Sequence, residues 1–98
     1  MEANTPVETS NPDELKEMGD KAFRQREFKD AAHYYTMAIE GLQGPPNPDI
    51  LDDRAHAYLR LRLNEECIAD CEQVMLIDPA FEKAYERKAR ALLALKNP

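Results

Sequence analysis

Two cysteines and two histidines are the side chains of this sequence that would ordinarily suggest metal or redox chemistry. Cys67 and Cys71 lie four residues apart within a predicted helix, where a disulfide between them is sterically poor. A structural zinc site takes four sulfur or nitrogen ligands, and neither His33 nor His56 has the spacing that would complete one. We therefore interpret both cysteines as small core residues and predict no metal, cofactor or redox site.

The sequence also lacks the patterns of other catalytic sites. It contains no phosphate-binding glycine loop and no nucleophile–base motif, so we predict that the domain is not an enzyme. The net charge of −6 argues against nucleic acid, whose binding depends on neutralising phosphates with Lys and Arg. Charge is unevenly placed: residues 1–78 carry 8 Lys/Arg against 17 Asp/Glu, and residues 79–98 carry 5 against 2.

The hydropathy pattern gives no sign of a membrane protein. No stretch approaches the roughly 20 apolar residues of a membrane span. The N-terminal MEANTPVETSNP has no apolar run of the kind that a signal peptide contains. We expect no membrane contact and a location in the cytoplasm, with the nucleus as the alternative.

Helix signals recur along the chain and predict five helices joined by short connections. Asn11 precedes Pro12 and acidic residues, and Asn47 precedes Pro48 in the same way, which is typical of a capped helix start. We expect Asn64 to cap the fourth helix. The predicted helices span about residues 12–25, 28–40, 48–62, 64–77 and 80–96, after a flexible tail at residues 1–11.

The five helices carry an internal repeat, which indicates a stack of similar helical hairpins. Positions on the first helix of each hairpin recur 36 and then 34 residues apart, and positions on the second helix recur 36 residues apart. The matching sets are Leu15, Leu51 and Tyr85; Gly19, Ala55 and Ala89; Ala31 and Cys67; Tyr35 and Cys71; Ala38 and Val74. The two extra residues of the first repeat fall in the loop GPPNP, where an insertion costs little.

A glycine inside the first helix needs an explanation, since it costs roughly 1 kcal/mol relative to alanine. Gly19 lies at one of the repeating small positions, and a small side chain lets the two helices of a hairpin approach closely. We predict that Gly19 packs against Ala31, and Ala55 against Cys67. Tyr34, Tyr35, Phe81 and Tyr85 are interpreted as packing aromatics.

These positions resemble the tetratricopeptide repeat (TPR), whose period is about 34 residues and whose pattern is W-x2-L-G-x2-Y, then A-x3-F, then P. The first repeat reads Leu15-x2-Met18-Gly19-x2-Ala22 and Ala31-x3-Tyr35. The second reads Leu51-x2-Arg54-Ala55-x2-Tyr58, Cys67-x3-Cys71 and Pro79, and the third begins Tyr85-x2-Lys88-Ala89-x2-Leu92. The resemblance implies an all-α fold of antiparallel helix-turn-helix repeats stacked as a right-handed α-solenoid. The domain would span residues 12–97, with repeats at 12–45 and 48–79 and a partial repeat at 80–97.

The stretches DELKEMGDKAF, DDRAHAYL and FEKAYERKARAL are similar to the repeat openings of co-chaperones such as the heat-shock organising protein. In that branch a concave groove binds the C-terminal tail Glu-Glu-Val-Asp of heat-shock chaperones. A two-carboxylate clamp of Lys, Asn, Asn, Lys and Arg holds the tail. The resemblance places the clamp at Lys16, Asp20, Asp53, Lys83 and Arg87.

Both clamp asparagines are aspartates here, which changes the expected chemistry. An asparagine amide can donate to a ligand carboxylate, whereas an ionised aspartate only accepts hydrogen bonds and repels the ligand. The wider groove face is expected to hold 6 Lys/Arg against 5 Asp/Glu, with lower-ranked contacts at Phe23, His56, Leu59 and Arg90. Solvated helix faces with internal Asp–Lys pairs are the plainer interpretation of the same residues.

The sequence therefore predicts a non-enzymatic adaptor that binds a partner's peptide or C-terminal tail, such as a chaperone tail, through an altered clamp. The alternative is a repeat scaffold that has lost tail binding and docks folded partners, or weakly self-associates, through other surfaces. Residues 91–95, ALLAL, place apolar side chains around much of the fifth helix and would supply such a surface.

Overall fold

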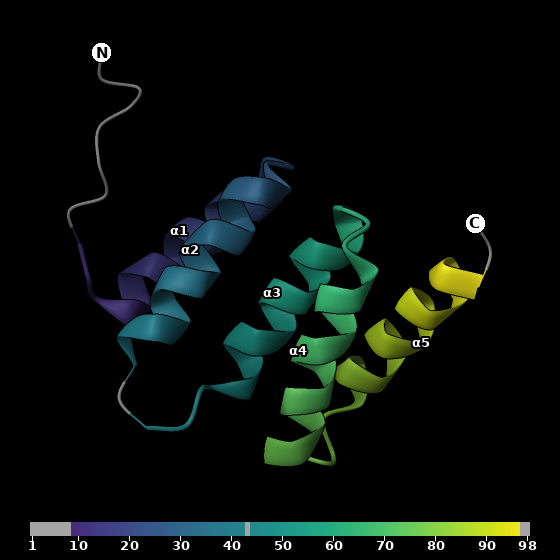
Figure 1. Cartoon of the computed structure of the whole chain (residues 1–98). Coiled ribbons are helices and arrows are strands. Elements are labelled where there is room, and N and C mark those ends of the chain that lie inside the picture. Colours follow the sequence, from purple (N-terminus) through teal and green to yellow (C-terminus); the bar gives the residue numbers. More distant parts are fainter. Residues whose placement is uncertain (1–8, 43, 97–98) are drawn as a thin grey trace.

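The computed structural model describes residues 9–42 and 44–96, which form helices and no strand. The helices are α1 (Pro12–Arg24), α2 (Phe28–Gly41), α3 (Pro48–Arg60), α4 (Asn64–Ile77) and α5 (Glu82–Lys96). Figure 1 shows α1 with α2, then α3 with α4, then α5, following one another across the molecule. The prediction of an all-α helical repeat solenoid is confirmed. None of these helices is long and apolar enough to cross a membrane.

The predicted helix starts at Asn11 and Asn47 are confirmed in detail. The Asn11 side chain accepts a hydrogen bond from the Asp13 amide at 2.9 Å, and Asn47 accepts one from Asp49 at 2.7 Å. A proline follows each cap at the first helical position, where no backbone N–H is needed. The same local chemistry therefore begins the first helix of both full repeats.

The two hairpin turns share a backbone feature that the sequence did not reveal. Arg26 and Arg62, 36 residues apart, have φ angles of 64° and 65°, in the left-handed region that usually favours glycine. In each turn the next amide donates to a carbonyl in the preceding helix, at 2.8 Å in the first turn and 2.9 Å in the second. Because of this turn α3 ends at Arg60, two residues earlier than predicted.

Two predicted helix starts are wrong by one or two residues. Asn64 is the first residue of α4 rather than its cap; Leu63 occupies the cap position and no side chain caps this helix. The last helix begins at Glu82 rather than Ala80, because the Asp78 side chain accepts from the Ala80 amide at 3.1 Å and holds a turn there.

The end of the predicted N-terminal tail is tied to the first helix. The Thr9 hydroxyl donates to the Glu14 carboxylate at 2.6 Å and accepts from the Asn11 amide at 3.0 Å. Residues 1–8 of that tail, and residue 97 at the predicted end of the domain, lie outside the described residues.

The core consists of two buried clusters that meet between the repeats. Leu15 and Tyr35 belong to the first cluster, whereas Cys67 and Cys71 belong to the second and are fully buried. Ile39 packs against both clusters and links them. The interpretation of the cysteines as small core residues is confirmed, and both are free thiols.

The partner of Gly19 differs from the one expected. A Cβ atom at Gly19 would lie 2.6 Å from Cε1 and 2.8 Å from Cδ1 of the Tyr35 ring, so the glycine makes room for that ring rather than for Ala31. Tyr35 occupies the position where the repeat pattern has phenylalanine, and its side chain is only 2% exposed. The two residues of the second expected pair, Ala55 and Cys67, both lie in the second buried cluster.

The repeat equivalents on α5 are exposed, unlike those on α1 and α3. Leu15 and Leu51 are buried, whereas Tyr85 at the matching position is 44% exposed and Leu92 is 49% exposed. The interpretation of Tyr85 as a packing aromatic is therefore wrong; its hydroxyl donates to the Pro79 carbonyl at 2.7 Å. Within the described residues, no later helix covers this face as α2 covers α1 and α4 covers α3.

Replacing Gly19 tests the close approach of α1 to the Tyr35 ring. We expect Gly19→Leu to lower the free energy of unfolding by about 1–3 kcal/mol, because the ring is buried and cannot move aside cheaply. Urea denaturation followed by circular dichroism measures this change. The control is Gly41→Ala, whose new Cβ would meet only ordinary contacts, the nearest at 3.5 Å. A Gly19→Leu protein as stable as the parent would contradict the explanation.

Candidate functional site

A hollow of about 330 Å³ lies where α1, α3 and α5 converge, with one side chain from α2 at its base. Its lining mixes both signs of charge with aromatic rings. The lining residues are Asp20, Phe23, Arg24, Tyr35, Asp53, His56, Lys83 and Arg87. Residues from three repeats that are far apart in the sequence therefore meet at one place.

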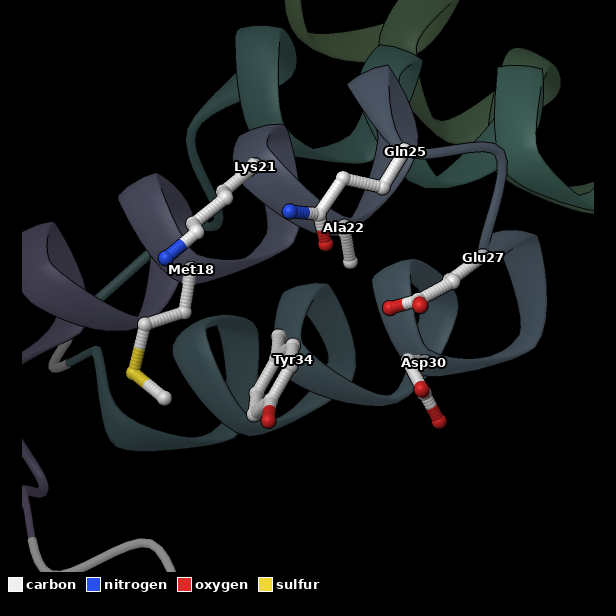
Figure 2. Close-up of a pocket in the computed structure, with 7 residues that line it drawn as sticks. All are labelled: Met18, Lys21, Ala22, Gln25, Glu27, Asp30 and Tyr34. Atoms are coloured by element: carbon white, nitrogen blue, oxygen red, sulfur yellow. The ribbon is translucent and has the colours of Figure 1, made fainter. Parts of the chain in front are cut away.

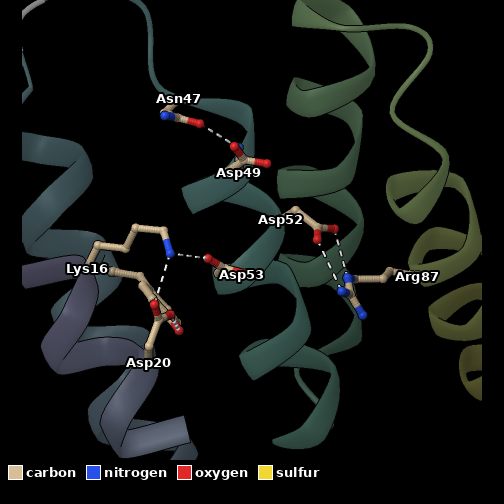
Figure 3. A network of polar contacts seen from close by, with 8 residues as sticks. Lys16, Asp20, Asn47, Asp49, Asp52, Asp53 and Arg87 are labelled. Carbon is tan, nitrogen blue, oxygen red and sulfur yellow. Dashed lines mark hydrogen bonds and ion pairs between the residues drawn. The ribbon is translucent and has the colours of Figure 1, made fainter. Parts of the chain in front are cut away.

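One wall of the hollow is a polar network between α1 and α3, drawn in Figure 3. Lys16 Nζ lies 2.9 Å from Asp20 Oδ2 and 3.4 Å from Asp53 Oδ2, so one ammonium group bridges two carboxylates. Tyr35 donates its hydroxyl hydrogen bond to Asp20 Oδ1 at 2.6 Å. Both Asp20 oxygens thus have protein partners, and the lysine is drawn towards the acids.

The ionisation of this network follows from its burial and its charges. Burial raises the pKa of Asp53 above its usual range, the negative charges of Asp20 and Asp52 add to this, and Lys16 opposes it. Burial lowers the pKa of Lys16, yet the hydrogen bond to Asp20 and the charge of Asp53 outweigh it, so the net shift is upward. The pKa of Tyr35 is raised by burial and by its hydrogen bond to Asp20, so the hydroxyl stays protonated and donates.

The opposite wall is built on a buried ion pair between α3 and α5. Arg87 donates from Nε to Asp52 Oδ1 at 2.7 Å and from Nη2 to Oδ2 at 3.1 Å, as Figure 3 shows. Asp52 is only 3% exposed, so the guanidinium both neutralises a buried carboxylate and is oriented by it. Lys83, one turn earlier on α5, is exposed and makes no ion pair within the described residues.

Aromatic rings and arginines occupy the end of the hollow nearest the hairpin turns. The Phe23 ring lies 4.6 Å from the His56 ring and 5.0 Å from the Phe28 ring, and the Arg60 guanidinium lies 4.6 Å from the Phe28 centroid. The pKa of His56 is lowered to about 4, first by burial and then by the positive charge of Arg87. His56 is therefore neutral near pH 7.

The structure brings together most of the site residues expected from the sequence. Of the clamp-equivalent positions, Asp20, Asp53, Lys83 and Arg87 line the hollow, and Lys16 adjoins it through both aspartates. Only two of the four lower-ranked groove residues lie in the hollow. Phe23 and His56 line the hollow, Leu59 packs against the second core cluster, and Arg90 is exposed and paired with Glu86 at 3.1 Å.

Two contributions to the site were missed by reasoning from the sequence. Tyr35 was assigned to packing alone, although a tyrosine at a phenylalanine position of the repeat pattern was a signal that its hydroxyl has a partner. Asp52 is not among the site residues named from the sequence, and nothing local in the sequence pairs it with Arg87, 35 residues away. Both residues act by positioning the clamp-equivalent side chains.

A second hollow, of about 260 Å³, lies on the opposite edge of the first hairpin, between α1 and α2 (Figure 2). Met18 and Tyr34 supply its apolar lining, and Lys21, Glu27 and Asp30 lie around it. None of the clamp-equivalent residues lines this hollow. It is therefore separate from the site predicted from the sequence.

Comparisons with known proteins agree with this architecture. No family model matches the sequence. The chain is 35% identical over 89 residues to the heat shock protein sti1 homolog of Schizosaccharomyces pombe, covering 91% of this chain and 15% of that protein. It is 39% identical over 83 residues to serine/threonine-protein phosphatase T of Aspergillus oryzae, covering 85% of this chain and 17% of the enzyme.

The chain thus spans less than a fifth of the length of these two curated relatives. Among solved structures, it is similar to the first TPR of Spaghetti (RPAP3) bound to the HSP90 peptide SRMEEVD. The TM-score is 0.80 at 32% identity, and the match covers 91% of this chain and 69% of that one. The repeat arithmetic, the helical stack and these matches lead to one conclusion: the chain belongs to the tetratricopeptide repeat family, in the branch that co-chaperones contain.

Proposed function

We propose that this domain is a non-enzymatic adaptor that binds an extended segment of a partner protein in the hollow between α1, α3 and α5. The observation that carries the proposal is that four clamp-equivalent side chains, from three helices and three repeats, line this hollow, and the fifth, Lys16, pairs with two of them. A related domain is bound to an HSP90 peptide, which supports the C-terminal tail of a heat-shock chaperone as the partner class. The hollow offers charged groups of both signs and aromatic rings, which suit recognition of a peptide segment.

The two aspartates at clamp-equivalent positions should weaken the binding of an acidic tail. Two unit charges about 4 Å apart interact by about 1 kcal/mol in water and about 4 kcal/mol at an effective dielectric of about 20. Asp20 and Asp53 lie at the edge of an open hollow, so the lower figure applies more closely. Both aspartates also pair with Lys16, whose ammonium group would otherwise be available to the ligand. We infer that a Glu-Glu-Val-Asp tail binds weakly to this domain.

Replacing both aspartates tests this inference. We expect the double variant Asp20→Asn with Asp53→Asn to bind the peptide SRMEEVD at least about tenfold more tightly than the parent, because two repulsive charges are removed and Lys16 is released. Calorimetry measures the affinity, and the gain should shrink as salt rises. The charge-matched control is Asp30→Asn with Glu66→Gln, two exposed acids on α2 and α4. Tight binding by the parent, or an equal gain in the control, would contradict the retuned clamp.

His56 offers an internal reporter of where a carboxylate binds. Burial lowers the pKa of His56, and the positive charges of Arg87, Arg60 and Arg90 lower it further. The negative charge of Asp52 opposes them, and the resulting pKa is about 4. A ligand carboxylate bound beside Arg87 adds negative charge near the imidazole, so the pKa should rise on binding. NMR titration of the His56 ring with and without SRMEEVD measures this, with the exposed His33 as the internal control. An unchanged His56 pKa at saturation would place the ligand elsewhere.

The exposed face of α5 supports a second candidate function, docking to another copy of the same chain. Leu93 on α5 is 59% exposed and Leu76 on α4 is 84% exposed, so large apolar side chains are left uncovered on the last two helices. Contact with a second copy would remove this apolar surface from water, which favours self-pairing.

Sedimentation equilibrium over a range of protein concentrations tests this second candidate. We expect weak association that Leu93→Lys abolishes, because a charge cannot be buried unpaired in the apolar contact. The control is His33→Lys, an exposed change on α2 at the other end of the stack. A monomer at every concentration would leave the groove as the proposed binding surface.

A further inference from the structure

The charges that line the hollow fall into two groups on opposite sides. Asp20 and Asp53 lie at the junction of α1 and α3, whereas Lys83 and Arg87 project from α5. Figure 3 shows this separation, with the Lys16 network between α1 and α3 and the Arg87 pair between α3 and α5. Arg24 adds a third cation on α1, one helical turn after Asp20, so the basic residues of the hollow come from both α5 and the end of α1. The hollow is therefore bipolar rather than uniformly basic.

The acidic side is only partly neutralised by the protein. Lys16 is the one cation within ion-pair distance of Asp20 and Asp53 among the described residues, so two carboxylates share one positive charge. No cation from the basic side compensates, because Arg87 is committed to Asp52. The pKa of Asp53 is raised first by burial, and the nearby carboxylates of Asp20 and Asp52 add to the rise. This side can still accept hydrogen bonds from a ligand cation.

The basic side has donors to spare. Lys83 and Arg24 are both exposed, and neither makes an ion pair within the described residues. Arg87 lines the hollow and uses Nε and Nη2 on Asp52, so its Nη1 makes no hydrogen bond within the described residues. A ligand carboxylate at this side would contact cations that the protein's own carboxylates do not fully neutralise.

The size of the hollow brings these two sides within reach of one short segment. Its volume of about 330 Å³ is at the small end of the range of roughly 300–1,000 Å³ for ligand pockets. A purely acidic segment would satisfy Lys83 and Arg87 but would place negative charge near Asp53. A purely basic segment would do the reverse, so complementarity with both sides requires both signs in the ligand.

We propose that the hollow prefers a peptide segment that carries a basic side chain and a carboxylate one or two residues apart. The basic group contacts Asp53 and Asp20, and the carboxylate contacts Lys83, Arg87 and Arg24. This preference rests on the proposed peptide-binding function and goes beyond it by naming the charge pattern of the ligand. It replaces the all-acidic tail with a bipolar one as the ligand that suits this groove.

Three capped peptides of equal length test the preference. They are Ac-Ala-Lys-Ala-Glu-Val-Ala-amide and its two neutralised forms, with Gln in place of either Lys or Glu. We expect the bipolar peptide to bind about fivefold more tightly than either singly charged form, since each matched charge contributes about 1 kcal/mol. Calorimetry gives the affinities, and NMR shifts show whether the hollow is the site.

Two double variants assign the sides of the hollow. Asp20→Asn with Asp53→Asn should remove the advantage of lysine, and Lys83→Gln with Arg24→Gln should remove the advantage of glutamate. Arg87 is left intact, because its loss would leave Asp52 buried without a partner and would disturb the fold.

The outcomes separate the ligand preference from the function on which it rests. A parent domain that binds the acid-only peptide as tightly as the bipolar one overturns the bipolar preference while leaving peptide binding in the groove intact. The bipolar preference is likewise overturned, with peptide binding intact, if both double variants rank the three peptides in the same order as the parent does. If no peptide shifts the resonances of the hollow, both the preference and the proposed function are wrong. Loss of the lysine advantage in one variant and of the glutamate advantage in the other supports the bipolar site.

Discussion

The Tyr35 side chain connects the packing of this domain to the chemistry of its groove. Its ring fills the space that a glycine leaves on α1, closely enough that even a methyl group at Gly19 would overlap it. Its hydroxyl reaches past the core and donates to Asp20 at 2.6 Å. Asp20 in turn orients Lys16, which then meets Asp53. The close approach of two helices therefore decides where the charges of the groove lie.

Buried ion pairs between helices hold the rest of the stack in register. Arg54 on α3 donates to both oxygens of Asp70 on α4, at 2.7 and 2.8 Å, and also to Thr36 on α2 at 3.1 Å. Arg87 joins α5 to Asp52 on α3 in the same two-pronged way. Such pairs add little net stability because desolvating the charges is costly. Their main effect is geometric, since a misplaced repeat would leave a buried carboxylate without its partner.

These constraints explain why the groove differs in charge from the rest of the molecule. The side chains that line it include three cations and two carboxylates, although the whole chain has a net charge of −6. Electrostatic attraction at long range is therefore weak or unfavourable for an acidic ligand, and the local pattern must supply the selectivity. A bipolar ligand satisfies that pattern at short range, where screening by salt is least effective.

Local residue types and the spacing of the repeats were sufficient to predict the five helices, the capped starts at Asn11 and Asn47, and the burial of Cys67 and Cys71. Periodicity predicts the helices and their buried residues because each helix must pack the same kind of face against its neighbour. The resemblance to the co-chaperone branch implied a groove lined by the first helices of successive repeats. The resemblance to the TPR family then supplied the clamp positions that converge on the hollow.

The tertiary structure alone decided which side chains meet. The pairing of Arg87 with Asp52, the fit of the Tyr35 ring against Gly19 and the sharing of Lys16 between two aspartates join residues 35, 16 and up to 37 positions apart. Each depends on the angle and offset at which whole helices stack, which no local pattern encodes. The exposure of Tyr85 has the same cause, because its repeat equivalents are buried only where a following helix covers them. Sequence thus determined the elements and the faces they present, and packing determined the partners and the charge pattern of the site.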